Sequence, residues 1–568
     1  MTTSMLSMTR LGLSALLLLV LGACGGGGGG SSRNNPAPPI GNPAPPQPLT
    51  QAQLNSASMI AAQSTFGLTY EAIVDIAETG PETWLDEQFA VPVTTHKSLV
   101  DELLNARAAG EYAEITDDLE FLILSRRLAW WHRAFSAPDL VRQRVAFALS
   151  EIFVVADTVD ALIINPYALA TYYDLLLTHS FGNYRDLLKA VALHPAMGIY
   201  LSHVNNRKAD PLNNTFPDEN FAREVMQLFS IGLFELNLDG SIKLDGNGDP
   251  LPTYGNEQIR EFAKIFTGLS YDGDAPYFGN PEPVYQLPMI MFDDFHEPGS
   301  KTLLGGQVVP AGQTGEQDID AAVDNLFNHP NVGPFMARLL IQRLVTSNPS
   351  PAYISRIASI FNDNGAGVRG DLQAVIRAML LDQEASTPTD QDQGGKLREP
   401  ILRYIAFVRA FNPSSPDGYL FNYGFYLQNV LRQHPQSSPS VFNFFQPDHT
   451  PAGTLADADL KAPEFQITTA TTIAGMTNVV DFGINADFVT DVQPPFETVS
   501  LDFSDYVAFA DDLDGLLDRL DLVFTYGQLS DSTRSAIINS IQDVEDVNFR
   551  TRMAIYLLLI SPDYAVQS

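Results

Sequence analysis

The sequence predicts a mostly α protein: one large multi-helix domain with a small β-hairpin insertion, preceded by a signal peptide and a flexible Gly/Pro linker. From about residue 51 onward, apolar residues recur at three-to-four spacing in segment after segment, which is the periodicity of amphipathic helices. The alternating runs typical of strands are scarce. Hydrophobic residues fill 45% of the 568 positions, enough for a large core, so a chain that is disordered throughout is excluded.

The charge balance excludes some classes of binding partner. The chain carries 33 Lys and Arg against 67 Asp and Glu, a net charge of -34 at pH 7. Such an acidic chain lacks the basic surface with which proteins bind nucleic acids, so no nucleic-acid partner is expected. Anionic lipid headgroups would repel it as well, so membrane attachment needs another device.

The first 23 residues have the features of a lipoprotein signal peptide. Arg10 precedes the apolar run Leu11–Leu21, which is too short to cross a hydrocarbon layer about 30 Å thick. A Leu-Gly-Ala-Cys sequence ends at Cys24, the only cysteine, and resembles a bacterial lipobox. The alternative is an ordinary signal peptide with a chance cysteine. We expect acyl chains such as palmitate on Cys24 to anchor the protein in a lipid bilayer of the cell envelope, extracytoplasmically, and at the outer membrane if the cell has two membranes.

Residues 24–50 are predicted to form a disordered tether. Six glycines, Gly25–Gly30, precede two serines and a proline-rich stretch over residues 36–48. Gly/Ser segments are flexible and proline-rich segments are extended, so the mean reach is about 30 Å. The tether would hold the all-helical domain, residues 51–568, away from the lipid surface.

The elements of the domain follow from periodicity and capping residues. Gly268 ends one predicted helix, and Asn256 is placed as its N-cap. A hairpin is predicted over Ser241–Tyr254, with turns at 239–240 and 245–248. The clearest helical segments are 119–135, 140–155, 184–193, 219–234, 258–267, 332–345, 372–381, 397–411 and 548–560.

Several motifs resemble known sites but lack a required feature. Residues 365–370 match G-x-G-x-x-G, yet they follow a helical pattern rather than a strand, so a helix–helix loop is predicted. Residues 245–249 look like the start of a calcium loop, but Pro250 stands where the turn glycine is needed. The H-E-x-x-H, C-x-x-C-H and G-x-S-x-G motifs are missing from the sequence, so zincin, c-type haem and standard α/β-hydrolase chemistry are not expected.

The first candidate site is centred on Glu224. On a helical wheel this carboxylate falls between Leu228 and Ile231, on the flank of the apolar face. A buried carboxylate needs a partner, and Asn220 and Arg223 lie nearby in the sequence. One interpretation is a structural ion pair or a helix-terminal acidic cluster; the other is a catalytic role for Glu224 and Arg223.

Two further groups are polar candidates. His296 stands among carboxylates in a loop, where Asp293, Asp294 and His296 could hold a divalent cation, or a carboxylate could orient His296 as a general base. The alternative is a hydrogen-bonding or solvated histidine. Arg398 and Glu399 begin an apolar helix, and their alternative role is in helix-start or interhelical contacts.

Together these segments resemble the bacterial "domain of unknown function 1800" family over about residues 54–565. The resemblance is carried by residues 62–67 (AQSTFG), 84–88 (WLDEQ), 142–153 (RQRVAFALSEIF), 172–176, 182–188, 194–197, 205–208, 219–232 (ENFAREVMQLFSIG), 259–269, 296–305, 398–400, 439–444 (PSVFNF) and 463–469 (PEFQITT).

The resemblance implies a secreted or surface protein that is mostly helical and has no established activity, so no catalytic residue is carried over. Many members have a histidine-containing stretch where this chain has Ser-Glu-Ile-Phe at 150–153. A histidine-based mechanism placed there would not apply to this chain.

Two function classes remain. The first is a surface-tethered binding or export and assembly protein, with an envelope protein or polymer as its partner. The alternative is an extracytoplasmic, hydrolase-like enzyme, with a divalent cation as an optional cofactor and a site that gathers Glu224, Asn220, Arg223, His296 and Arg398. The second class requires Glu224 and His296 to share a cleft, because proton transfer needs hydrogen-bond reach.

Overall fold

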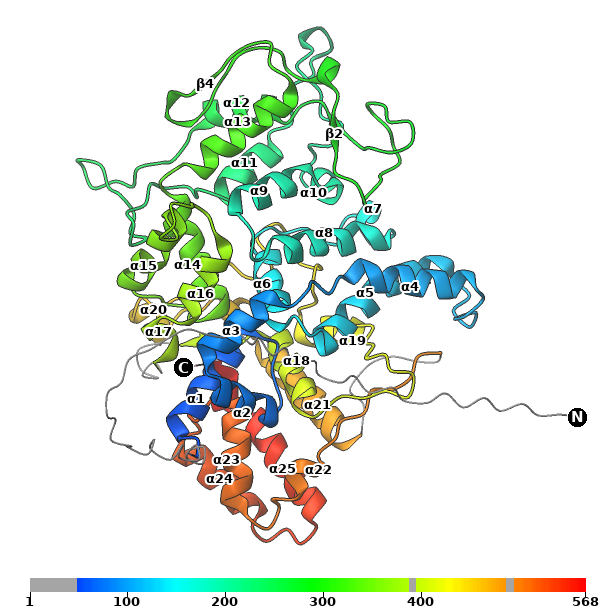
Figure 1. Ribbon diagram of the computed structural model, residues 1–568, viewed down its shortest axis with the longest axis vertical. Helices are drawn as coiled ribbons and strands as arrows, with labels where there is room; N and C mark the ends of the chain where they lie inside the picture. Colours follow the sequence, from blue (N-terminus) through cyan, green and yellow to red (C-terminus); the bar gives the residue numbers. More distant parts are fainter. Residues whose placement is uncertain (1–47, 388–394, 487–494, 568) are drawn as a thin grey trace, which may run out of the picture. The chain divides into compact units, whose positions relative to one another are not determined.

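The computed structural model describes residues 48–387, 395–486 and 495–567, and the described residues from Leu49 onward form one compact unit. Helices dominate the described residues, which contain three short antiparallel strand pairs, β1–β2, β3–β4 and β5–β6 (Figure 1). The predicted mostly α fold is therefore confirmed. The predicted signal peptide, Cys24 and nearly all of the tether lie outside the described residues.

The helices and strands have the following bounds. The first helices are α1 (Gln51–Ser64), α2 (Tyr70–Thr79), α3 (Pro81–Ala90), α4 (His96–Ala108), α5 (Asp118–Ser136), α6 (Leu140–Ser150), α7 (Asp160–Ile163), α8 (Pro166–His179), α9 (Tyr184–Leu193), α10 (Pro195–Tyr200), α11 (Asn220–Gln227), α12 (Asn256–Ile265) and α13 (Gly315–Phe327). The later helices are α14 (Val332–Leu344), α15 (Pro351–Asn362), α16 (Leu372–Leu380), α17 (Gln383–Ser386), α18 (Pro400–Ala410), α19 (Phe425–Leu431), α20 (Thr454–Asp457), α21 (Ala470–Asn485), α22 (Ser504–Val507), α23 (Leu513–Phe524), α24 (Asp531–Ile541), α25 (Val547–Leu559) and α26 (Pro562–Ala565). The strands are β1 (Leu269–Ser270), β2 (Ile290–Met291), β3 (Lys301–Thr302), β4 (Val308–Val309), β5 (Lys396–Leu397) and β6 (Val566–Gln567).

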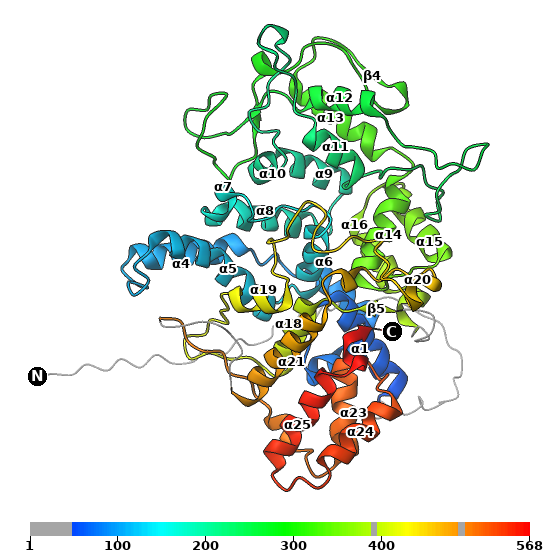
Figure 2. The same cartoon turned by 180° about the vertical axis from the view of Figure 1, so that it is seen from behind.

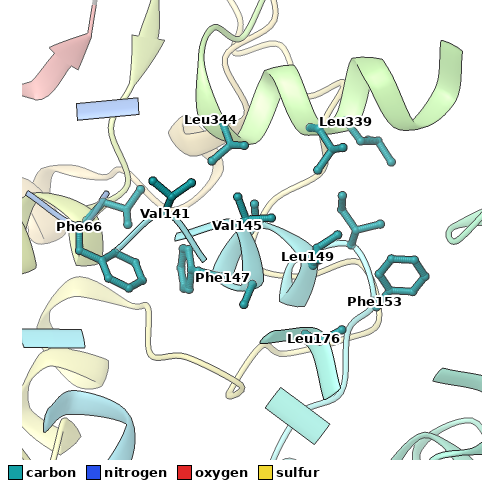
Figure 3. Close-up of a cluster of buried hydrophobic side chains, with 14 of the residues drawn as sticks. Phe66, Val141, Val145, Phe147, Leu149, Phe153, Leu176, Leu339 and Leu344 are labelled. Carbon is teal, nitrogen blue, oxygen red and sulfur yellow. The ribbon is translucent and has the colours of Figure 1, made fainter. Parts of the chain in front are cut away.

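Helix α6 lies at the centre of the main hydrophobic core. Every residue from Val141 to Leu149 is buried, as expected for a helix that neighbours cover on all sides. Figure 3 shows Val145 and Leu149 facing Leu339 and Leu344 of α14. Because α6 also carries two arginines, its burial forces these charges to find partners inside the domain.

Segments far apart in the sequence pack together. Helices α1 and α2 lie beside α23 (Figures 1 and 2), and the Ser58 hydroxyl donates to the Leu522 carbonyl. Strand β6 pairs with β5, and Gln567 donates its side-chain amide to the Val345 carbonyl at 2.9 Å. The core therefore joins both ends of the described chain to its middle. None of the described helices is both long and apolar enough to cross a bilayer.

Two predicted helices end earlier than expected. The segment predicted over 140–155 ends at Ser150, because the amides of Ile152 and Phe153 both turn back to the Leu149 carbonyl. The segment predicted over 219–234 begins as α11 but ends at Gln227. There the Phe229 amide donates a hydrogen bond to the backbone carbonyl of Glu224. Gly232 has a positive φ of 71°, which a glycine adopts readily.

The predicted hairpin is one part of a larger β insertion, the 233–253 loop. Its segments 233–237, 241–245 and 249–253 are linked by isolated antiparallel bridges. Three backbone hydrogen bonds of 2.8–3.0 Å join the segments: the amides of Lys243, Leu251 and Glu235 donate to the backbone carbonyls of Glu235, Lys243 and Leu251, respectively. Each segment is thus bonded to both others, which holds the loop in a defined shape.

Candidate functional site

A cavity of about 480 Å³ lies against the end of α6, and its size is that of a small-molecule site. Its walls come from the end of α11 and the residues that follow, from α14, from the 233–253 loop and from the 441–448 segment. They are mainly hydrophobic. The polar side chains that line the cavity are Glu151, Gln227, Arg338, Arg343, Gln446 and Asp448.

At its inner end, where Glu151 lines it, the cavity adjoins two buried carboxyl groups. Glu151 directly follows α6 and accepts a hydrogen bond from Asn443 at 3.0 Å. Glu399 directly precedes α18, is fully buried and accepts a hydrogen bond from Gln433 at 2.6 Å. Glu151 Oε2 and Glu399 Oε1 have no hydrogen-bond partner among the described residues.

Burial is the main cause that raises the pKa of Glu151, to about 8, and the negative charge of Glu399 raises it further. Arg343 and Arg144 oppose the shift. The Glu151 carboxyl is therefore largely protonated at neutral pH.

Two buried arginines accompany the pair. Arg144 of α6 donates to the Arg343 carbonyl at 2.6 Å, while its Nε and Nη1 have no acceptor among the described residues. Arg343 of α14 stacks over the Phe445 ring at 4.6 Å and places its Nε 3.8 Å from Glu151 Oε2. We call Glu151, Glu399, Arg144 and Arg343 the Glu151 cluster. Its polar groups are only partly satisfied by the protein.

A third arginine, Arg338, lines the cavity further along α14. It is partly buried, and among the described residues it has no hydrogen bond or ion pair. Burial lowers its pKa, and the charge of Asp448 opposes this shift. A guanidinium in such a position favours an anion as its partner.

The structure buries Glu224 but does not give it the expected partner. Its Oε2 has no donor among the described residues, and burial raises its pKa while Arg223 opposes the shift. Arg223 instead binds Glu219 at 3.4 Å, and Asn220 is exposed at the start of α11. The expectation of a paired carboxylate is therefore wrong, because Arg223 lies on the outer side of the helix. Glu224, Arg223 and Asn220 do not line the cavity.

His296 is buried in a different cluster with Lys301 and Asp318, which we call the His296 cluster. Its Nδ1 donates to the Thr267 carbonyl at 2.9 Å, and its Nε2 lies 2.9 Å from Asp318 Oδ2. The Lys301 ammonium binds both Asp318 and the Glu297 carbonyl. His296 does not line the cavity with Glu151, and neither does Glu224, so this cavity does not bring the two together.

The three residues considered for a divalent cation are not gathered. Asp293 and Asp294 are exposed, whereas His296 is buried. Asp293 accepts a hydrogen bond from the Gly315 amide at 2.8 Å, at the start of α13. Across the described ranges, no group of three or more His, Cys, Asp or Glu side chains is arranged to hold a metal ion.

Arg398 and Glu399 are adjacent in the sequence but lie in different surroundings in the structure. Arg398 lies 5.1 Å from the Tyr564 ring centroid, and its amide donates to the Ala565 carbonyl beside the β5–β6 pair. This is a structural contact of the kind expected as the alternative. Glu399 belongs to the Glu151 cluster, so one residue singled out in the sequence lies beside the inner end of the cavity without lining it.

The sequence did not single out Glu151, Arg144, Arg343 or Arg338. One signal was present: Arg144 and Glu151 stand close to either end of the apolar run 145–149, and charges that are buried with such a run must be paired or functional. Their meeting with α14 and α18 depends on the tertiary fold.

A second hollow, of about 470 Å³, lies between α8, α9 and residues 285–288. Its charged side chains already form hydrogen bonds or ion pairs with other parts of the protein. Asp174 accepts from the amides of His96 and Lys97 at the start of α4, and Lys189 binds Asp320 at 2.7 Å. His194 accepts from the Ala196 amide at the start of α10. This hollow is therefore the weaker candidate.

Comparison with curated proteins and with solved structures gives no match. One family model, described as "Protein of unknown function (DUF1800)", matches residues 59–566. The match includes α11 and α14, which contribute to the cavity walls, and α6 and α18, which adjoin the Glu151 cluster. The chain belongs to the DUF1800 family.

Proposed function

We propose that this protein is a lipid-anchored protein of the cell envelope whose helical domain binds a small, largely apolar molecule in the cavity beside α6. The observation that carries the proposal is the cavity itself, about 480 Å³ in volume and lined mainly by hydrophobic side chains. This makes the binding or export role expected from the sequence more specific.

The cavity wall continues into exposed apolar surface. Leu233, Phe234, Ile242 and Phe442 all line the cavity, yet each remains exposed to solvent. Exposed hydrophobic side chains that are gathered at a cavity are typical of ligand-binding surfaces. An apolar molecule bound there would cover them.

Binding is tested with N-phenylnaphthylamine, a neutral apolar probe that fluoresces when it leaves water. Leu228→Trp fills part of the cavity and should weaken probe binding at least about tenfold, since a contact worth 1.4 kcal/mol changes affinity tenfold. Leu238→Trp is the matched control, because Leu238 is exposed on the 233–253 loop and does not line the cavity. Equal binding by both variants would contradict the proposal.

The anchor is tested separately. Cys24→Ser should move the protein from the membrane fraction to the soluble fraction, because two acyl chains hold a protein stably at a bilayer and their attachment needs the thiol. An unchanged membrane-bound pool would show that the protein is held in another way.

An enzymatic role is the second candidate, favoured by the protonated Glu151 at the cavity wall. In hydrolysis, Glu151 would give a proton to the leaving oxygen, water would add its hydroxyl group to the acyl carbon, and the remaining proton of that water would return to Glu151. Turnover of p-nitrophenyl butyrate that Glu151→Gln abolishes would support this role. Loss through Glu224→Gln or His296→Gln, with Glu151→Gln active, would support the site first expected from the sequence.

A further inference from the structure

We propose that the molecule bound in this cavity is an anionic amphiphile. Its negatively charged head would lie against Arg338 and Arg343, and its hydrocarbon chain would run along the apolar walls to the mouth. This inference rests on the proposed function, because it names the class of ligand for the same cavity.

Arg338 is the first reason. Its side chain lines an apolar cavity, and it has no hydrogen bond or ion pair among the described residues. Because Arg338 is only partly buried, its guanidinium is accessible from the cavity, and its fork of N–H groups matches a carboxylate or phosphate. The opposing charge of Asp448 acts on it, but Asp448 is not within hydrogen-bond or ion-pair distance.

The charge at the inner end is the second reason. Burial raises the pKa of Glu151 to about 8, so at neutral pH this carboxyl is largely uncharged and Glu399 alone brings a negative charge. Arg144 and Arg343 bring two positive charges to the same place, and Arg398 adds a third that acts on Arg144. The inner end therefore has an excess of positive charge, which an anionic head would neutralise and a cationic head would increase.

Hydrogen-bond donors without partners also favour an anionic head group at the inner end. Arg343 Nε has no acceptor at hydrogen-bond distance among the described residues, and Arg343 itself lines the cavity. The protonated carboxyl of Glu151, on the same wall, is a further hydrogen-bond donor. A neutral apolar ligand would leave all of these groups without partners, whereas an anionic head would accept from them.

The walls determine where the chain lies. Leu228 and Phe335 line the cavity beside the arginines, and Ile242 and Phe442 form its solvent-exposed part. A molecule with its head at the inner end would thus cover exposed apolar surface with its chain. Removal of this surface from water would stabilise the complex.

The test uses probes that share one hydrocarbon chain and differ in the head: dodecanoate, dodecanol and dodecyltrimethylammonium. Each is titrated into the purified full chain, and binding is followed by displacement of N-phenylnaphthylamine. We expect dodecanoate to bind about ten- to a hundredfold more tightly than dodecanol, the range for a hydrogen bond to a charged group, and the cationic probe to bind most weakly.

Variants locate the head group. Arg338→Gln should reduce dodecanoate binding to the level of dodecanol and leave dodecanol binding unchanged. Arg338→Lys, which keeps the charge but loses the fork, should give an intermediate loss. Arg223→Gln is the matched control, because Arg223 binds Glu219 outside the cavity, and it should change neither affinity. Circular dichroism melting curves establish that each variant is folded.

The outcomes separate the two proposals. If dodecanoate and dodecanol bind equally, or if Arg338→Gln leaves the preference intact, the anionic head is wrong while apolar binding stands. If no probe is bound by the folded wild-type chain, both the inference and the proposed function fall.

Discussion

Two buried clusters of charged side chains in this domain differ in how fully the protein satisfies them. In the His296 cluster, Lys301, His296 and Asp318 bind one another, and both ring nitrogens have partners. Asp318 Oδ1 is the one side-chain atom of this cluster without a partner among the described residues. In the Glu151 cluster, each of the two carboxyl groups and each of the two arginines has at least one polar side-chain atom without a hydrogen-bond partner among the described residues. Glu151 and Arg343 also line a cavity.

The difference teaches that burial of charge alone does not mark a functional site. A cluster whose charges compensate each other contributes to the stability and uniqueness of the fold. A cluster with unpaired donors beside an open volume has capacity left for a ligand. His296, the more conspicuous residue in the sequence, belongs to the first kind.

The largest expected effect tests the His296 cluster as a structural unit. Asp318→Ala leaves the Lys301 ammonium buried without its counter-charge, and we expect it to lower the free energy of unfolding by about 3–5 kcal/mol. Urea denaturation measures the loss. Asp320→Ala is the matched control on the same helix, because its partners Arg185 and Lys189 are partly exposed, and it should cost about 1 kcal/mol or less. Equal losses of unfolding free energy in the two variants would show that the buried His296 cluster stabilises the fold no more than the partly exposed ion pairs of Asp320.

The next prediction concerns the pH dependence that the Glu151 cluster imposes. The folded state holds the Glu151 proton more tightly than the unfolded state, because burial raises its pKa from 4.5 to about 8. This contribution to stability is fully present below the unfolded pKa and is lost as the pH rises through about 8. Between these values the free energy of unfolding should fall by up to about 1.4 kcal/mol per pH unit. Thermal melts of wild type and Glu151→Gln across this range measure it; parallel curves would contradict it.

Glu224 gives a smaller effect of opposite sign. Its buried carboxylate lacks a partner at one oxygen, so Glu224→Gln removes an uncompensated charge. We expect this variant to be about 1 kcal/mol more stable at pH 7 and to lose that advantage in acid, where the native carboxyl is itself protonated. Denaturation at both pH values is the measurement. A destabilised variant would mean that the carboxylate is paired in solution.

The smallest effect is expected on the 233–253 loop. Leu244 is 57% exposed, so Leu244→Ser should change the free energy of unfolding by less than about 0.5 kcal/mol. Chemical denaturation checks this. A larger loss would show that the loop contributes to the core, and its variants could then not report on binding alone.

Local pattern was enough to predict the helices but not all of their ends. The segment predicted over 119–135 is α5, Asp118–Ser136, because its periodicity and its N-cap Asp117 are properties of neighbouring residues. The early end of α11 depends on backbone contacts around Gly232, and the packing of Phe335 against that glycine belongs to the tertiary fold. Pattern alone therefore extended the helix too far.

The candidate site was only partly accessible from the sequence. Glu399 could be singled out because it opens an apolar helix. Its partner Glu151 follows α6, far away in the sequence, and nothing in the local pattern joins the two. Likewise, Arg338 looks like any polar residue of an amphipathic helix until the loops that build the cavity are in place.

The pairing of β5 with β6 has a consequence for how the polypeptide acquires its structure. Lys396 and Leu397 pair as a strand with Gln567 and Val566, and α1 packs against α23. Contacts over such long sequence separations must close large loops first, so they form slowly. A chain synthesised from its N-terminus would therefore complete these contacts only after its last helices and its last strand have been made.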